Sequence, residues 1–268
     1  MTYFGFLFIF VGIPLLILGG LAWYDWKQGR HLPAELTHWP AAGALAALVI
    51  IAVVYTTPWD NYLVATRVWW YDPALVSGVV WGWVPLEEYS FFVLQTLLTG
   101  LWILYLARHH LQPAIFLPNP GWRWRITALC GIVWLGSLGL LISGWSPGTY
   151  LALELSWALL PIIIQLAFGA DILWYYGRLV FWSIIPSTLY LSLADALAIQ
   201  SGTWTINPQL SLGVYLGGVL PIEEFIFFAL TNTLVTFGLI LALTRLSQER
   251  LATLLKYSRV RPIKRSVC

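Results

Sequence analysis

The chain of 268 residues is 59% hydrophobic and only 10% charged, with a net charge of +2. Because a soluble globular domain carries about 25% charged residues, this composition excludes an ordinary soluble enzyme or binding domain. Apolar runs of about 20 residues, the length that a helix needs to cross a bilayer, recur along the whole chain. The lipid bilayer is therefore its expected surrounding, and no nucleic acid is expected as a partner.

Seven membrane-spanning helices are predicted in chain order. If the C-terminus faces the cytoplasm, 13 of the 14 Lys and Arg residues lie on the cytoplasmic side, and only Arg67 lies outside. This distribution fits the positive-inside rule, so we expect a multi-pass protein of the cell membrane with its N-terminus outside. The predicted spans are about 3–24, 41–57, 76–107, 126–144, 149–170, 179–198 and 212–245.

A repeated motif divides the chain into two similar halves. Residues 85–92 read PLEEYSFF and residues 221–228 read PIEEFIFF, each on the third span of its half. Four spans separate the two copies, so both halves cross the membrane in the same direction. The predicted fold is an all-α integral membrane protein with seven transmembrane helices, in which two parallel three-helix repeats are joined by a linking helix. Its parts are the first repeat (1–107), the linking helix and loops (108–148), the second repeat (149–245) and a basic cytoplasmic tail (246–268).

The third span of each half is too long for a straight helix. Residues 76–107 would extend over roughly 48 Å at about 1.5 Å per residue, against a hydrocarbon core of about 30 Å. The motif proline interrupts each span and several glycines precede it, which favours a break. We expect a short re-entrant or tilted segment, then a full helix that starts at Pro85 or Pro221 and carries both glutamates in its first turn.

The paired glutamates have a structural and a catalytic interpretation. A carboxylate at a helix N-terminus caps free amides, but one would suffice for a cap and each copy has two. An aromatic ring follows each glutamate one turn later, and an acid next to ring faces suits a reaction that donates a proton and stabilises a carbocation. Burial favours the protonated acid that this donor must be. One glutamate of each pair is thus expected to cap the helix and the other to donate the proton.

The candidate site residues follow from this interpretation. The catalytic candidates are Glu87 and Glu223, followed by Glu88 and Glu224. Two aspartates at corresponding positions could hydrogen-bond these glutamates or act as the base, whereas Glu154 has no obvious counterpart and receives no role. Aromatic side chains are expected to stabilise the cation. The substrate-binding candidates are Trp69, Trp204, Tyr89, Phe91, Phe92, Phe225, Phe227, Phe228, Asp60 and Asp195.

The sequence lacks the residues that several other chemistries require. The chain has no glycine-rich dinucleotide fingerprint, no phosphate-binding loop and no H-E-x-x-H sequence. A covalently bound retinal needs a lysine within a span, and Lys27, Lys256 and Lys264 all lie outside the predicted spans. His109 and His110 are adjacent on a loop and are interpreted as solvated, so no metal site is expected.

The repeated P-[LI]-E-E-[YF]-x-F-F sequence, with an aspartate upstream of each copy, resembles that of the membrane-integral lycopene cyclases over nearly the whole chain. The chain is similar to the fused tandem form of an enzyme that also occurs as two small subunits. The resemblance implies a lycopene β-cyclase of carotenoid biosynthesis, which closes the open ends of lycopene into β-ionone rings by an acid-catalysed, non-redox isomerisation. It implies no flavin or other cofactor, lycopene or a related acyclic carotenoid as substrate, and other carotenoid-pathway enzymes as partners.

Two other function classes stay open at this point. Parallel repeats, broken helices and buried carboxylates are also typical of proton-coupled transporters, although few Ser, Thr or Asn residues lie near the acids to form a hydrated path. A non-catalytic membrane protein that binds carotenoids or lipids is the third interpretation. The residues do not decide whether one or both ends of the substrate are cyclised.

Overall fold

Helices make up most of the computed structural model, which describes residues 1–110 and 115–260. The first half contains α1 (Tyr3–Phe6), a π-helical turn (Leu7–Gly12), α2 (Ile13–Lys27), a short 3-10 turn (Ala34–Leu36), α3 (Ala41–Ala65) and α4 (Leu86–His110). The linker contains α5 (Pro120–Ser143), and a second 3-10 turn (Ser146–Gly148) follows it. The second half contains α6 (Thr149–Tyr175), α7 (Gly177–Gln200) and α8 (Ile222–Leu243), and α9 (Arg245–Val260) comes last.

Seven helical segments within the described residues are long and apolar enough to cross a membrane, which confirms the predicted all-α membrane fold. They correspond in order to the seven predicted spans. The third and seventh, Leu86–His110 and Ile222–Leu243, begin about ten residues later than predicted. The expected break at each motif proline is therefore present, and both motif glutamates lie in the first turn of their helix.

β-hairpins form the segments before the two motifs, where the sequence predicted a short re-entrant or tilted segment. Gly82 (φ 70°) and Gly218 (φ 74°) supply positive φ angles in the turns, which residues with a side chain rarely adopt. The hairpins pair the backbone groups that a helix would otherwise pair, so the chain can turn sharply into each central helix. The pairs are β2 (Val80–Trp81) with β3 (Val84–Pro85), and β5 (Tyr215–Leu216) with β6 (Leu220–Pro221).

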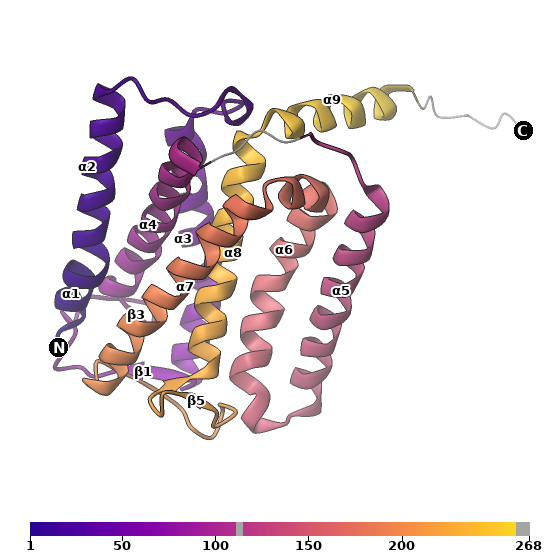
Figure 1. Cartoon of the computed structure of the whole chain (residues 1–268). Coiled ribbons are helices and arrows are strands. Elements are labelled where there is room, and N and C mark those ends of the chain that lie inside the picture. The colour runs from indigo at the N-terminus through magenta and orange to yellow at the C-terminus, as the bar shows by residue number, and fades with distance from the viewer. Residues whose placement is uncertain (111–114, 261–268) are drawn as a thin grey trace, which may run out of the picture.

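The two motif helices, α4 and α8, lie side by side at the centre of the bundle (Figure 1). α4 packs against α2, α3, α7 and α8, while α8 packs against α3, α4, α6 and α7. They are the most buried of the seven spans. α5 packs on the outside of the bundle against α6 (Figure 1). Both motifs consequently begin central helices at the same end of the molecule.

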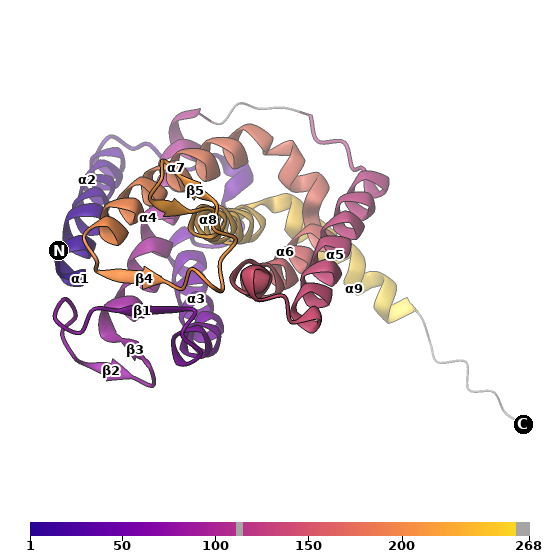
Figure 2. The same cartoon turned by 90° about the horizontal axis from the view of Figure 1, so that it is seen from below.

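A short pair of strands joins the two halves at this end. β1 (Trp69–Tyr71) runs antiparallel to β4 (Trp204–Ile206), and Trp70 lies opposite Thr205 (Figure 2). Each strand leads from the second helix of its half toward the hairpin of that half. The pair therefore fixes the two motif regions relative to each other.

Hydrogen bonds recur in matched pairs in the two halves. The Tyr55 hydroxyl of α3 donates to the Trp157 carbonyl of α6 at 2.9 Å. In the same way, the Tyr190 hydroxyl of α7 donates to the Phe10 carbonyl at 2.8 Å. In each case the second long helix of one half is tied to the first helical segment of the other half.

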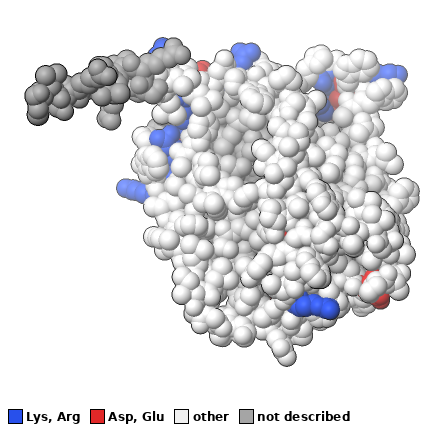
Figure 3. Space-filling model, turned by 180° about the vertical axis from the view of Figure 1, so that it is seen from behind, with Lys and Arg blue, Asp and Glu red and all other residues white. Residues whose placement is uncertain are grey.

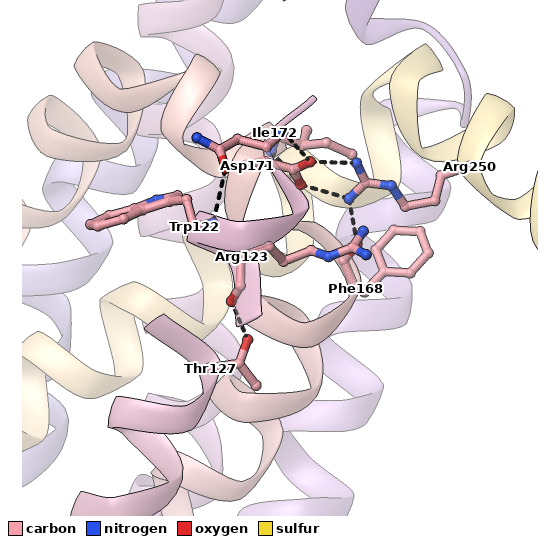
Figure 4. Close-up of polar contacts among 8 residues, drawn as sticks. Trp122, Arg123, Thr127, Phe168, Asp171, Ile172 and Arg250 are labelled. Carbon is pink, nitrogen blue, oxygen red and sulfur yellow. Dashed lines mark hydrogen bonds and ion pairs between the residues drawn. The ribbon is translucent and has the colours of Figure 1, made fainter. Parts of the chain in front are cut away.

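α9 crosses the opposite end of the bundle, where Arg250 anchors it (Figures 1 and 4). The guanidinium donates to Oδ1 and Oδ2 of Asp171 at 2.7 and 2.8 Å, and to the Phe168 carbonyl at 2.6 Å. Asp171 follows a kink in α6 at Gly169 (φ −152°, ψ 32°). The described part of the predicted tail, 246–260, is thus a helix held to the bundle, and the rest of the tail lies outside the described residues.

Charged side chains are scarce on the flanks of the molecule. Lys and Arg gather toward the end that carries α9, and the middle of the face in Figure 3 is almost entirely uncharged. Large apolar side chains on the outside of the helices, such as Leu16, Val54 and Ile142, are 70%, 68% and 87% exposed. An apolar belt of this kind is what a bilayer would cover.

Candidate active site

The first glutamate of each motif holds the loop that precedes its helix. Glu87 Oε1 accepts from the Ser77 amide at 2.5 Å, and its Oε2 accepts from the Ser77 hydroxyl at 3.1 Å. Glu223 Oε1 accepts from the Leu212 amide at 2.7 Å, and its Oε2 accepts from the Ser211 hydroxyl at 3.2 Å. We call these contacts the loop latches. Both carboxyl groups are buried and accept hydrogen bonds from backbone amides. The two glutamates that the sequence favoured as acids therefore bond the preceding loops.

The second glutamate of each motif is bonded by tyrosine hydroxyls instead. Tyr3 and Tyr71 both donate to Oε2 of Glu88, Tyr71 at 3.0 Å. Tyr150 donates to Oε1 of Glu224 at 2.7 Å. Burial, followed by neighbouring carboxyl groups, raises the pKa of the Tyr71 hydroxyl well above its usual value. This phenol therefore stays protonated and acts as a hydrogen-bond donor.

Glu88 and Glu224 line one central cavity together with Asp60 and Asp195, which we call the acid cavity. Its volume is about 50 Å³, which is room for a few water molecules. The Trp204 indole N–H donates to Oδ1 of Asp195 at 2.9 Å. Within the described residues, neither oxygen of Asp60 and only this one of Asp195 has a hydrogen-bond partner. The aspartates thus share the cavity with the glutamates, but no aspartate–glutamate hydrogen bond joins them in the described part of the chain.

Aromatic rings form the remaining wall of the acid cavity. Most of the predicted ring residues are present there, whereas two are not among the lining residues. Tyr89 instead accepts from the Asn61 amide at 3.0 Å and donates to the Trp81 carbonyl at 2.8 Å, which holds the first hairpin. Phe225 is the other predicted ring that is not among the residues lining the cavity. The predicted rings that do line it are Trp69, Trp204, Phe91, Phe92, Phe227 and Phe228.

A second cavity adjoins the first, and we call it the side cavity. Phe92 and Phe227 line both cavities. The side cavity has a volume of about 260 Å³ and is mostly apolar. Its walls come from α3, α4, α6 and α8, and its rim residues Ile51 and Ile164 are 59% and 64% exposed. The apolar side cavity thus reaches the flank of the bundle at α3 and α6, and it shares the rings of Phe92 and Phe227 with the acid cavity.

The tyrosines bonded to the glutamates were missed by reasoning from the sequence. Tyr3 and Tyr150 precede Pro14 and Pro161 by the same number of residues, so aligning the two halves could have paired them. Tyr71 has no such signal, since Ile206 occupies its place in the second half. Trp59, which stacks on Trp157 with ring centroids 4.4 Å apart at the boundary of the two cavities, was also missed.

Glu154 is fully buried on α6, one turn after Tyr150. Neither of its carboxyl oxygens has a hydrogen-bond partner among the described residues. Its position in the first half is occupied by Leu7. For metals, the described residues contain no group of three or more His, Cys, Asp or Glu side chains arranged to hold an ion.

Comparison with known proteins places this geometry in a family. The family model described as lycopene cyclase matches residues 1–106 and 147–241. The chain is 37% identical over 240 residues to a lycopene beta-cyclase of Halobacterium salinarum, which covers 90% of this chain and 95% of that protein. It is 39% identical over 205 residues to a bifunctional lycopene cyclase/phytoene synthase of Leptosphaeria maculans, covering 72% of this chain and 35% of that protein.

A protein of the same bifunctional description from Blakeslea trispora is 35% identical over 199 residues, with 71% of this chain and 32% of that protein covered. No solved structure matches the chain. The matched residues span both motif helices and leave out α5. The chain therefore belongs to the lycopene cyclase family.

Proposed function

We propose that this protein cyclises the open ends of lycopene to β-ionone rings by acid catalysis, without a change of oxidation state. The observation that carries the proposal is the acid cavity, where Glu88 and Glu224 lie among aromatic rings next to the apolar side cavity. Its family membership and its similarity to the named lycopene beta-cyclase support the same function. The reaction needs no net oxidant or reductant, because the product has the mass of the substrate.

The reaction needs an acid, a cation-stabilising surface and a base. A carboxylic acid adds its proton to the terminal double bond, which leaves a tertiary carbocation. An internal double bond attacks this cation and closes the ring, and loss of a proton from a neighbouring carbon forms the ring double bond. Ring faces attract a positive charge, and preorganised carboxyl groups stabilise it as it forms. The acid cavity supplies both groups within one enclosure.

The side cavity supports an apolar substrate over a water-soluble one. We propose that the polyene enters from the bilayer between α3 and α6, passes Phe92 and Phe227, and places one end group among the acids. Because Phe92 and Phe227 line both cavities, these two rings border the proposed route from the side cavity to the acids. A transporter of polar cargo would need a polar path instead.

We further propose that the protein lies in the cell membrane with its N-terminus outside and the α9 end in the cytoplasm. The clustering of Lys and Arg at that end supports this orientation. The matched hydrogen bonds of Tyr55 and Tyr190 support two parallel repeats related by a pseudo-two-fold axis along the membrane normal. Other carotenoid-pathway enzymes in the same membrane are proposed partners, since two relatives are described as bifunctional with phytoene synthase.

Expression in cells that accumulate lycopene tests the function. The intact protein is expected to convert the red pigment to an orange-yellow product of unchanged mass. Glu88→Gln and Glu224→Gln should each lower conversion by at least about 100-fold, as removal of a general acid or base does. Glu87→Gln and Glu223→Gln keep an oxygen that accepts from the loop amide and should retain most activity. Unchanged pigment with the intact, correctly inserted protein would favour the carrier or the non-catalytic binder.

A further inference from the structure

The two halves offer their cavity glutamates different partners. In the first half, two phenols donate to the same oxygen of Glu88. In the second half, Glu224 receives one phenol, and Ile206 stands where the first half has Tyr71. Hydrogen bonds donated to a carboxylate favour its charged form over the neutral acid. On this ground Glu88 is the better site for a negative charge.

The second half also carries an additional buried acid. Glu154 lies one helical turn after Tyr150, and its charge would interact with that of Glu224. Because no described residue donates to Glu154, an ionised carboxylate there would be buried without compensation, which is strongly unfavourable. The neutral acid has an O–H group that can donate to the Tyr150 oxygen, since residues four apart on a helix share a face.

We propose, on the basis of the function above, that Glu224 donates the proton, that Glu88 removes it, and that Glu154 is a positioning residue that acts on Glu224 through Tyr150. The Glu224 O–H bond breaks as a C–H bond forms at the terminal double bond. The internal double bond closes the ring and moves the charge to a ring carbon. The Glu88 carboxylate then takes a proton from the neighbouring carbon as the ring double bond forms.

One ring closure leaves the number of protons in the cavity unchanged. After one ring closure, Glu88 is protonated and Glu224 is a carboxylate, so one proton must pass between them before the next turnover. Glu88 and Glu224 line the same cavity with Asp60 and Asp195, so donor and acceptor share one enclosure with two further carboxyl groups. During the first step, Tyr150 donates to the carboxylate that forms on Glu224, and a neutral Glu154 strengthens this donor by bonding to its oxygen.

Loss of the base and loss of the acid should give different products. The ring cation can lose a proton from any carbon next to the charged carbon, and each choice places the double bond differently. With Glu88→Gln the cation still forms, so the small residual product should contain rings with a displaced double bond. Glu224→Gln should give at least about 100-fold less of any cyclic product, with the double-bond position of the intact enzyme. Chromatography and NMR of the pigments distinguish the isomers.

Glu154→Leu tests the positioning residue, because Leu7 occupies the matching place in the first half and a leucine leaves no buried charge. We expect kcat to fall about 10-fold, with KM for lycopene unchanged, and Glu154→Gln, which keeps a neutral donor, to restore most of the rate. Thr236→Val is the matched control, since Thr236 is also fully buried with a hydroxyl that lacks a partner among the described residues. It should leave kcat unchanged.

The outcomes separate this inference from the function on which it rests. If Glu88→Gln and Glu224→Gln both retain full activity, the acid cavity is not the active site and the proposed mechanism fails with it. If both lose activity but the isomer shift follows Glu224→Gln, the donor and acceptor are reversed and the inference is wrong while the site stands. If Glu154→Leu is as fast as the intact enzyme at equal folded yield, Glu154 has no such role.

Discussion

The first half offers its cavity glutamate two phenol donors, whereas the second half offers its own one phenol and an additional buried acid. Glu88 accepts from two phenols, and Glu224 accepts from one and has Glu154 nearby. The latches of Glu87 and Glu223 are nearly the same in both halves. The contacts that hold the two motif helices are thus alike, while the contacts of the cavity glutamates differ. The proposed mechanism uses this difference to assign the acid to one half and the base to the other.

A contrast in the opposite direction appears at the aspartates. Asp195 is bonded to the Trp204 indole at 2.9 Å, whereas Asp60 and the Trp69 indole N–H have no partner among the described residues. The tryptophans occupy corresponding strand positions, β1 in the first half and β4 in the second. The two sides of the cavity are therefore similar in residue types and unequal in bonding. Substitutions made in matched pairs can measure how much this inequality matters.

The largest effect on kcat in these comparisons is expected for the tyrosines that donate to the two cavity glutamates. Tyr150→Phe removes the only phenol of Glu224, whereas Tyr71→Phe leaves Tyr3 on Glu88. A hydrogen bond to a charged group contributes about 1.5–3 kcal/mol, so Tyr150→Phe should lower kcat by about 10- to 100-fold. Tyr71→Phe should cost less than half of that in free energy of activation. Steady-state rates with lycopene in proteoliposomes measure both, and equal losses would contradict the unequal roles of the two halves.

The loop latches should respond equally in the two halves. Glu87→Ala and Glu223→Ala each leave a buried amide without its acceptor, at a cost of about 1–3 kcal/mol in the free energy of unfolding. Glu87→Gln and Glu223→Gln should recover most of this stability, because their amide oxygen still accepts. Unfolding titrations with a denaturing detergent compare the four variants. A loss of activity in the Gln variants at full stability would show that the latch residues take part in the chemistry.

Much of the fold was predictable from the sequence. The length of the apolar runs and the positions of Lys and Arg between them indicate where the membrane-spanning helices lie. The break at each motif proline was also predictable, since proline and glycine act locally on the backbone. The hairpins before Pro85 and Pro221 were not, because strands of two residues carry no periodic pattern. The contact between Ser77 and Glu87 was not predictable either, because it joins a loop to the helix and helical spacing cannot show it.

The sequence predicted many of the residues that line the acid cavity but not the hydrogen bonds between them. Repetition alone indicated that the acidic pairs and the aspartates belong together, because each occurs at corresponding positions. Tyr71 and Glu154 could not be found in this way, since each exists in one half only. A search for repeated residues discards these unique ones. They are the groups that distinguish the two halves chemically.

A smaller effect is expected at the tryptophans. Trp204→Phe removes a bonded N–H and leaves Asp195 without a donor, while Trp69→Phe removes an N–H that lacks a described partner. Both variants lose the same ring volume, so their difference isolates the hydrogen bond at about 1 kcal/mol. Trp204→Phe should therefore be the less stable of the two in a denaturing-detergent titration. The reverse order would mean that the unpaired Trp69 indole and Asp60 interact in the membrane-embedded protein.

The smallest effects test whether the two halves are related by symmetry. Tyr55→Phe and Tyr190→Phe remove hydrogen bonds of 2.9 and 2.8 Å between a second helix and the first helical segment of the other half. Each should cost about 0.5–1.5 kcal/mol, and the two costs should agree, because the donor and acceptor groups are the same. Only Tyr55 borders the side cavity, so Tyr55→Phe alone should change KM for lycopene. A change in KM for Tyr190→Phe instead would move the substrate passage to the gap between α7 and the first helical segment.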